Sequence, residues 1–212
     1  RNRIVDRFLL YDGLVVRRNG GDWTAHDTSD GLMDRPVTLL ATRAGGLWAA
    51  GSHQRAAATA QFDGERWSLR THPDLSWSID ARAVFEAADG TLWFGAANDL
   101  DMKLGHLGGL LSYQPSSLLT SAPEEWTRHR PPATSTHSYG IAQSGDGTIW
   151  SISTRGLEEF DGKAWTVRDD PIELRQPCDS IYPALNGDLW VGSRWGGAFR
   201  RDGNTWTQHD TR

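Results

Sequence analysis

The stretch ADGTLWFG, residues 88–95, places an aspartate, two glycines and a tryptophan within one short run. Taken alone, it has two interpretations: a chemical site with a carboxylate beside an aromatic platform, or a structural turn. The phrase recurs as AGGLWAAG around Trp48, GDGTIWSI around Trp150 and NGDLWVGS around Trp190. A phrase repeated along a chain is typical of a repeat architecture, and the spacing of its copies decides between the two interpretations.

Tryptophan accounts for 11 of the 212 residues, and most of these tryptophans fall into two interleaved series. Leu or Ile precedes each member of the first series, and Thr or Ser follows each member of the second. The spacings are 45, 57 and 40 residues in the first series and 44, 59, 39 and 41 in the second. A period near 40 residues, with one longer unit, is typical of a four-stranded propeller blade. The first series is Trp48, Trp93, Trp150 and Trp190, and the second is Trp23, Trp67, Trp126, Trp165 and Trp206.

The last unit, residues 180–210, shows the expected strands most clearly. Asn186-Gly187, Gly196-Gly197 and Asp202-Gly203 supply the positive φ angles that tight hairpin turns need. The runs between these turns are short and rich in apolar and aromatic residues, without a helical period. We predict four strands, A to D from the centre of the propeller outwards, at residues 180–185, 188–193, 197–201 and 205–209.

The predicted fold class is all-β. We expect a β-propeller of four-stranded blades, with four full blades and a partial one, in a single domain of residues 1–212. The N-terminal run RIVDRFLL, residues 3–10, offers one further strand to the partial blade. The predicted blades are 1–28 (partial), 37–71, 82–130 (with insertions), 139–169 and 179–210.

The order of an Asp-Gly turn, LW-x-G, a Gly-Gly-Leu hairpin and W-T resembles the two-component regulator propeller repeat. The resemblance covers residues 12–210; it departs from the pattern at Ala44-Gly45-Gly46 and in SHQRAAATAQFDG, residues 52–64, which lacks Gly-Gly-Leu. It implies the extracytoplasmic sensor propeller of a bacterial hybrid histidine kinase, in the periplasm or outside the cell. Any kinase activity would then lie in a further C-terminal region.

The number of blades leaves two alternatives: a self-contained five-bladed ring, or a segment of a larger propeller. The resemblance implies about seven blades, and the sequence does not begin with methionine. We expect a segment of a larger propeller.

Composition excludes several classes of function. The net charge is −5 and the pI is about 5.8, without a cluster of basic residues, so we expect neither nucleic acid nor an anionic membrane as a partner. No run of 18 apolar residues is present, so we expect no membrane contact by this chain itself. Cys178 is the single cysteine, so no internal disulfide forms, and we expect it to be a small buried residue.

Residues that recur once per blade are interpreted as structural. Asp89, Asp146 and Asp188 belong to A–B turns rather than to a calcium site, which needs six or more oxygens around one point. We expect the first tryptophan series to pack between neighbouring blades and the second to cover blade edges. Four histidines share one repeat position and are expected to be solvated loop residues: His26, His72, His129 and His209. We predict no catalytic residue, metal or cofactor.

Residues that do not repeat are the functional candidates, because function on a scaffold concentrates in variable loops. Residues eleven before the first-series tryptophans should start the A strands near the central mouth; they are Val37, Arg82, Tyr139 and Asp179. Guanidinium, phenol, imidazole and indole groups at that mouth suit a polar small molecule, an oligosaccharide or an anion. The predicted ligand-binding residues are Arg55, Trp77, Arg82, Asp99, Asp101, His106, His137, Tyr139, Arg155, Arg194 and Trp195.

We interpret the chain as a non-catalytic ligand-sensing or interaction module of a bacterial signalling receptor, with a homodimer formed through the parent receptor. One alternative is a propeller lyase or hydrolase, with His137 beside Asp179 or Arg82 at the mouth. A second is a repeat lectin with one sugar per blade. The lectin predicts similar polar residues in every B–C loop, and these loops differ.

Overall fold

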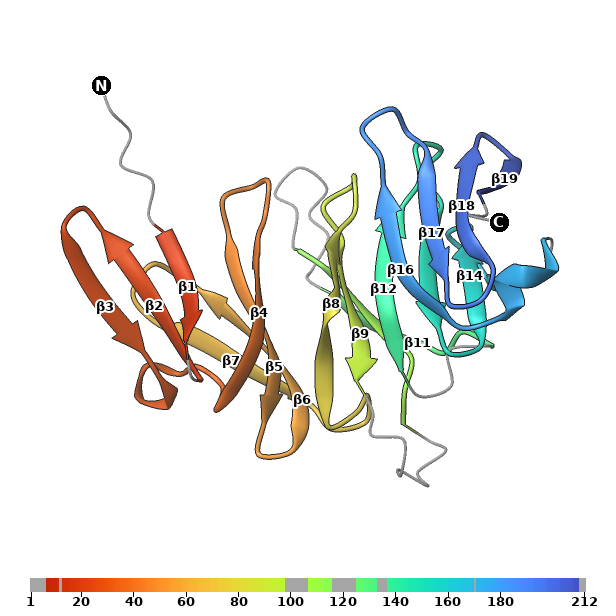
Figure 1. Ribbon diagram of the computed structural model, residues 1–212. Coiled ribbons are helices and arrows are strands. Elements are labelled where there is room, and N and C mark those ends of the chain that lie inside the picture. The colour runs from red at the N-terminus through yellow and green to blue at the C-terminus, as the bar shows by residue number, and fades with distance from the viewer. Residues whose placement is uncertain are drawn as a thin grey trace.

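Five antiparallel β-sheets stand side by side in chain order in the computed structural model (Figure 1). The structure describes residues 7–11, 13–97, 107–115, 125–132, 137–169 and 171–209. Within these ranges the first sheet has three strands and each of the others has four. This confirms the predicted propeller with four full blades and one partial blade.

The strand bounds follow the repeat. The first sheet contains β1 (Arg7–Tyr11), β2 (Leu14–Asn19) and β3 (Asp22–His26), and the second β4 (Arg35–Ala41), β5 (Leu47–His53), β6 (Ala56–Phe62) and β7 (Trp67–His72). The third contains β8 (Ser78–Glu86), β9 (Leu92–Ala97), β10 (Leu110–Gln114) and β11 (Glu125–His129), and the fourth β12 (Ser138–Gln143), β13 (Ile149–Ser153), β14 (Gly156–Phe160) and β15 (Trp165–Val167). The fifth contains β16 (Cys178–Pro183), β17 (Leu189–Ser193), β18 (Gly197–Asp202) and β19 (Thr205–His209). In the described part of the links between sheets there are two short 3₁₀ helices, η1 (Thr28–Asp30) and η2 (Ile172–Arg175).

The A strands of the four full blades, β4, β8, β12 and β16, contact one another in sequence along the inner side of the row. The strand predicted from RIVDRFLL is β1, which pairs antiparallel with β2. The first and fifth sheets lie at opposite ends of the row (Figure 1), so these five blades do not close into a ring on one another. A larger blade number stays a prediction.

Each A strand carries a β-bulge near its start. Val37, Tyr139 and Asp179 are single extra residues in β4, β12 and β16, each without a partner on the neighbouring strand. In β8 the bulge is longer, because residues 80–83 stand opposite Gly95 alone. A bulge turns a side chain out of the regular alternation, so each of these strands presents a non-repeating side chain at the same end.

Three of the four tryptophans of the first series pack between sheets, as predicted. Each of the first three members contacts the second-series tryptophan of the following sheet, edge to face. The ring-centroid distances are 6.1 Å for Trp48–Trp126, 6.0 Å for Trp93–Trp165 and 5.8 Å for Trp150–Trp206. Such pairs contribute about 1 kcal/mol each beyond their buried area. Inter-sheet pairing therefore accounts for six of the nine tryptophans in the two series.

The prediction that the four repeated histidines are solvated loop residues is wrong for His26, His72 and His129, whereas His209 is solvated as predicted but ends a strand. Each one ends a D strand, and its ring packs on an aromatic ring of its own sheet or the next one. His26 and His72 are buried, His129 is half-buried, and His209 in the last sheet is exposed. These histidines are more buried where the following sheet places an aromatic ring against them. Trp126 does so for His72, with a centroid distance of 4.7 Å.

The aspartates of the A–B turns act as turn residues, as predicted for Asp89 and Asp146. Each accepts a hydrogen bond from the backbone N–H two residues on, at 2.9 Å from Thr91 and 3.1 Å from Thr148. Asp188 differs, because its carboxylate pairs with Arg200 at 2.7 Å. Asn186 occupies the turn position in that blade, accepting from the Asp188 backbone N–H.

Ser144 satisfies a buried indole in the fourth sheet, and the third sheet lacks its counterpart. The Ser144 hydroxyl accepts from Trp150 Nε1 at 2.8 Å, whereas the equivalent residue beside Trp93 is Ala87. We expect Ser144→Ala to lower the free energy of unfolding by about 2 kcal/mol, because it leaves the buried N–H of Trp150 unpaired. Ala87→Ser should raise it by about 1 kcal/mol by pairing Trp93. Urea unfolding of both variants checks this; a loss from both substitutions would contradict it.

Candidate functional site

The bulges of β8, β12 and β16 bring charged and aromatic side chains together at one end of the inner strands. Arg82 and Tyr139 are bulge residues, and the Arg82 guanidinium carbon lies 4.9 Å from the centre of the Tyr139 ring. On the same ring, His137 packs with a centroid distance of 4.4 Å and an interplanar angle of 39°. The phenol ring therefore has the imidazole and the guanidinium as neighbours.

Asp80 joins His137 to Arg82. One carboxylate oxygen, Oδ2, lies 2.6 Å from His137 Nε2 and 2.9 Å from Arg82 Nη2. The other oxygen, Oδ1, accepts from the backbone N–H of Arg82 at 2.8 Å and from its Nε at 3.1 Å. The Asp80 side chain is only 10% exposed, so these bonds are made largely out of solvent.

The ionised form of Asp80 is stabilised. Burial on its own raises the pKa of this carboxyl, but the hydrogen bonds from His137 and then Arg82 outweigh burial and hold the pKa well below its usual range. Asp80 is therefore a carboxylate at neutral pH. Because His137 Nε2 hydrogen-bonds to this carboxylate, Nδ1 of a neutral imidazole is left as an acceptor.

A second ion pair stands next to the first. Asp179, the bulge residue of β16, accepts from Arg194 Nη2 at 2.6 Å and from its Nε at 3.0 Å. The hydrogen bond from Arg194 lowers the pKa of Asp179, and the charge of Arg82 lowers it further. Both ion pairs thus belong to one electrostatic group. We call Asp80, Arg82, His137, Tyr139, Asp179 and Arg194 the mouth cluster.

The mouth cluster offers paired charges rather than a single strong charge. The side chains of Arg82, Arg194 and Asp179 are about half exposed, at 55%, 47% and 45%, so their remaining donor and acceptor positions face solvent. Two carboxylates, two guanidinium groups and a phenol ring can hydrogen-bond a polar ligand and stack on its apolar face. No group of three or more His, Cys, Asp or Glu side chains in the described ranges has the geometry of a metal site.

The structure brings four of the predicted site residues into this cluster: Arg82, His137, Tyr139 and Arg194. Sequence reasoning did not find Asp80, which is the residue that connects the others. Its only signal in the sequence is its position two residues before Arg82, at an A-strand start longer than that of the other blades.

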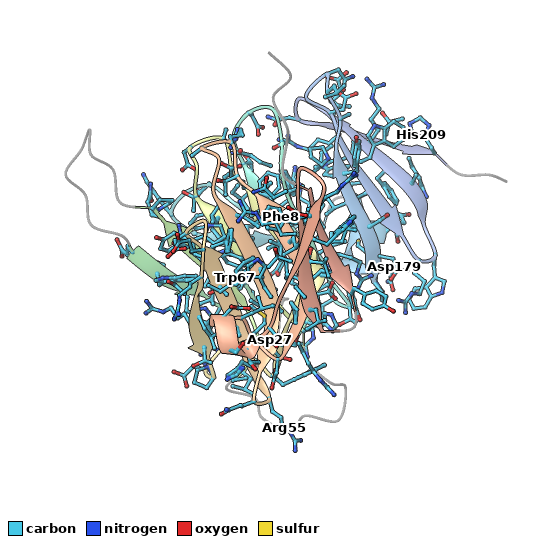
Figure 2. All side chains as sticks on the ribbon, turned by 90° about the vertical axis from the view of Figure 1, so that its left-hand side faces the viewer. Phe8, Asp27, Arg55, Trp67, Asp179 and His209 are labelled. Atoms are coloured by element: carbon cyan, nitrogen blue, oxygen red, sulfur yellow. The ribbon has the colours of Figure 1, made fainter. Side chains whose placement is uncertain are left out.

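The other predicted residues are not members of the mouth cluster. Arg55 is exposed in the β5–β6 turn and stands well apart from Asp179 (Figure 2). Trp77 is half-buried, Arg155 is exposed in the β13–β14 turn, and Trp195 is 66% exposed in the β17–β18 turn. Within the described ranges, no hydrogen bond or ion pair joins these four residues to the mouth cluster. The remaining candidates, Asp99, Asp101 and His106, lie outside the described residues.

The chain matches no protein-family model, and no curated protein is significantly similar to it in sequence. None of the helices in the described part is long and apolar enough to cross a membrane.

Solved structures with the same fold include several bacterial propellers. PorZ of Porphyromonas gingivalis, an essential bacterial surface component of the type-IX secretion system, superposes with a TM-score of 0.69 at 11% identity over 96% of this chain. Virginiamycin B lyase of Staphylococcus aureus superposes with 0.62 at 12% over 95%. The extracellular domain of a B. thetaiotaomicron protein assigned as a hybrid two-component system, BT4673, superposes with 0.64 at 14% over 98%.

These similarities define the class of protein, a β-propeller, and at such identities they show the fold alone. The chain spans 32%, 64% and 30% of the length of these three proteins, respectively.

Proposed function

We propose that this propeller module is the extracytoplasmic part of a bacterial two-component-type receptor. Its role is to sense a polar small molecule, an oligosaccharide or an anion, which binds at the mouth cluster. The observation that carries the proposal is the presence of two ion pairs, Asp80–Arg82 and Asp179–Arg194, near Tyr139. The bulges at the start of three neighbouring inner strands present these side chains. A scaffold of repeated blades with non-repeating polar residues at one end is typical of binding modules.

The similarity to the extracellular domain of a two-component system supports this role and the extracytoplasmic location. It also agrees with the repeat that the sequence resembles. Signal transfer would follow if the ligand rearranged contacts at this end of the blades or at a homodimer interface of the parent receptor.

Ligand binding at the mouth predicts a specific pattern among alanine variants. In thermal-shift screening and calorimetry against oligosaccharides and small carboxylates, we expect Arg82→Ala and Tyr139→Ala to weaken binding roughly tenfold or more, because each removes a stacked or hydrogen-bonding group. Arg155→Ala is the matched control, since it removes an exposed arginine outside the cluster and should leave affinity unchanged. If no compound binds, or if all three variants bind equally well, the mouth is not the site.

A hydrolase or lyase is the second candidate, favoured by the 2.6 Å contact between Asp80 and His137. A carboxylate that orients an imidazole leaves its other nitrogen available as a general base. The S. aureus lyase, studied with quinupristin, was made catalytically inactive by a histidine-to-alanine change. Turnover of lactones or esters that falls at least about a hundredfold in His137→Ala would favour this candidate. Absence of turnover in the wild type would exclude it for those substrates.

A further inference from the structure

Arg82 and Arg194 are held in the same way in the mouth cluster. Each donates through Nε and Nη2 to the two oxygens of one carboxylate, that of Asp80 for Arg82 and that of Asp179 for Arg194. A two-bond contact of this kind fixes the plane of the guanidinium group. Both groups are therefore oriented in the absence of a ligand, while about half of each side chain is exposed.

The outer edge of each guanidinium group remains free to donate. Within the described ranges, Nη1 of Arg82 and Nη1 of Arg194 make no hydrogen bond. Asp80, by contrast, has little acceptor capacity left, because each of its oxygens already accepts two hydrogen bonds. The exposed hydrogen-bonding positions of the mouth cluster are therefore mainly donors.

Tyr139 lies beside both arginines. The centre of its ring is 4.9 Å from the guanidinium carbon of Arg82. The hydrogen bond to Asp80 raises the pKa of Arg82, that to Asp179 raises the pKa of Arg194, and the phenol of Tyr139 adds to both shifts. An electrostatic contribution to both groups requires the phenol oxygen to lie near both guanidinium groups. The phenol and the two arginines thus form one group of donors.

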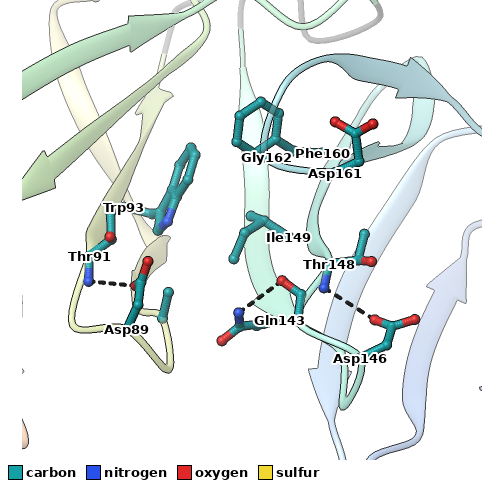
Figure 3. Close-up of a pocket in the computed structure, with 12 residues that line it drawn as sticks. Asp89, Thr91, Trp93, Gln143, Asp146, Thr148, Ile149, Phe160, Asp161 and Gly162 are labelled. Atoms are coloured by element: carbon teal, nitrogen blue, oxygen red, sulfur yellow. Dashed lines mark hydrogen bonds between the residues drawn. The ribbon is translucent and has the colours of Figure 1, made fainter.

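The opposite end of the A strands has the opposite character. A pocket of about 310 Å³ lies there, between the A–B turns of the third and fourth sheets (Figure 3). Its ionisable lining residues in the described part of the chain are Asp89, Asp146 and Asp161. Arg201 pairs with Asp146 at 2.9 Å and leaves the other two carboxylates without a cation from this arginine. Carboxylates repel anions, so of these two places the mouth is the one that suits an anion.

We propose that the ligand of the mouth cluster carries a carboxylate, which accepts hydrogen bonds from Nη1 of Arg82 and Nη1 of Arg194. The Tyr139 hydroxyl is a third donor to the same group. This inference rests on the proposed sensing function and names its ligand class. An acidic sugar and a small organic acid share the required chemistry.

Hydrogen-bond matching favours a carboxylate over the other polar groups. A carboxylate has only acceptor positions, whereas an ammonium group would bring further donors to donors. A sugar hydroxyl also accepts, but a bond between two charged partners is roughly twice as strong as a neutral one. A phosphate group carries up to about two negative charges. Asp80 and Asp179 already balance the two arginines, so the cluster has no net positive charge to offset a second negative charge.

Calorimetry of the full chain with D-glucuronate, D-glucose, succinate and inorganic phosphate tests the ligand class. D-glucuronate and D-glucose differ only in the carboxylate that replaces a hydroxymethyl group. We expect D-glucuronate to bind roughly tenfold or more tightly than D-glucose, because it adds charge-assisted hydrogen bonds. Succinate distinguishes the two sources of a carboxylate: the tighter binder of succinate and D-glucuronate identifies the source, and either one supports the proposal.

Three variants test the position of the carboxylate. Arg194→Gln should weaken the binding of D-glucuronate roughly tenfold and change that of D-glucose little. Asp179→Asn should strengthen it roughly threefold, because it removes a negative charge beside the ligand. A gain in affinity cannot result from misfolding. Arg155→Gln is the matched control, since it makes the same change in net charge outside the cluster and should leave the affinity unchanged.

The proposal fails if D-glucuronate binds no more tightly than D-glucose, if phosphate binds more tightly than either carboxylate, or if Asp179→Asn weakens binding. Tyr139→Ala separates this failure from that of the proposed function. If this variant weakens the binding of D-glucose while D-glucuronate shows no preference, the mouth is the site but its ligand is neutral. If none of the four compounds binds, the carboxylate proposal is overturned, and the wider ligand screen described above decides whether the mouth is a site at all.

Discussion

Replacing Gly156 by alanine is expected to lower the free energy of unfolding by about 4 kcal/mol. Gly156 is the first residue of β14 and has a φ of +113°, which L-residues rarely adopt. A Cβ at this position would overlap the carbonyl oxygen of Leu174 and lie 2.9 Å from the Cα of Arg175. Both obstacles are backbone atoms of η2, so a side-chain rotation cannot relieve the clash.

Gly64→Ala separates the effect of overlap from that of backbone conformation. Gly64 has nearly the same φ, +112°, but a Cβ at this position would have no atom within 4 Å of it. Its substitution should therefore cost only about 1–2 kcal/mol, the penalty of a left-handed alanine. Urea denaturation of both variants measures the difference. Equal losses of unfolding free energy would show that η2 moves to accommodate the new methyl group.

The strands were predictable because the signals that define them are local and recur. The strand predicted at 205–209 is β19, and that predicted at 197–201 is β18 with one further residue. Turn dipeptides mark both ends of these strands. The tryptophan series shows which residues occupy equivalent positions in successive blades. The position eleven residues before each first-series tryptophan also falls in the bulge of each A strand, because the inner hairpins share one length.

The centre of the mouth cluster was not predictable in the same way. The β8 bulge is longer than the bulges of the other A strands. The sequence pattern shared by the other blades does not predict this difference. Asp80 and His137 are 57 residues apart and meet only because β8 and β12 are neighbours. The three buried or half-buried histidines of the D strands were misjudged for the same reason. Their burial depends on rings of another sheet, and no local pattern reports such contacts.

His72 makes the stability of the protein depend on pH. Burial, and then the nearby charge of Arg70, lower the pKa of this imidazole from 6.5 to about 4. The residue is 9% exposed, and its Nε2 lies 2.9 Å from the Thr59 hydroxyl. Between these two pKa values the unfolded chain binds a proton that the folded protein does not, so folding weakens as the pH falls. The contribution is fully present above pH 6.5 and is lost on approaching pH 4.

We expect the wild type to lose about 3 kcal/mol of unfolding free energy between pH 7 and pH 4 relative to His72→Gln, because the glutamine does not titrate. Carboxylates titrating in the same range affect both proteins and cancel in the difference. His209→Gln is the matched control, because this histidine holds the same repeat position in the fifth sheet but is exposed. Urea unfolding at pH 7, 6, 5 and 4 provides the measurement. Parallel curves for the wild type and His72→Gln would mean that the His72 ring is protonated in the folded state, and that its contact with Trp126 tolerates the charge.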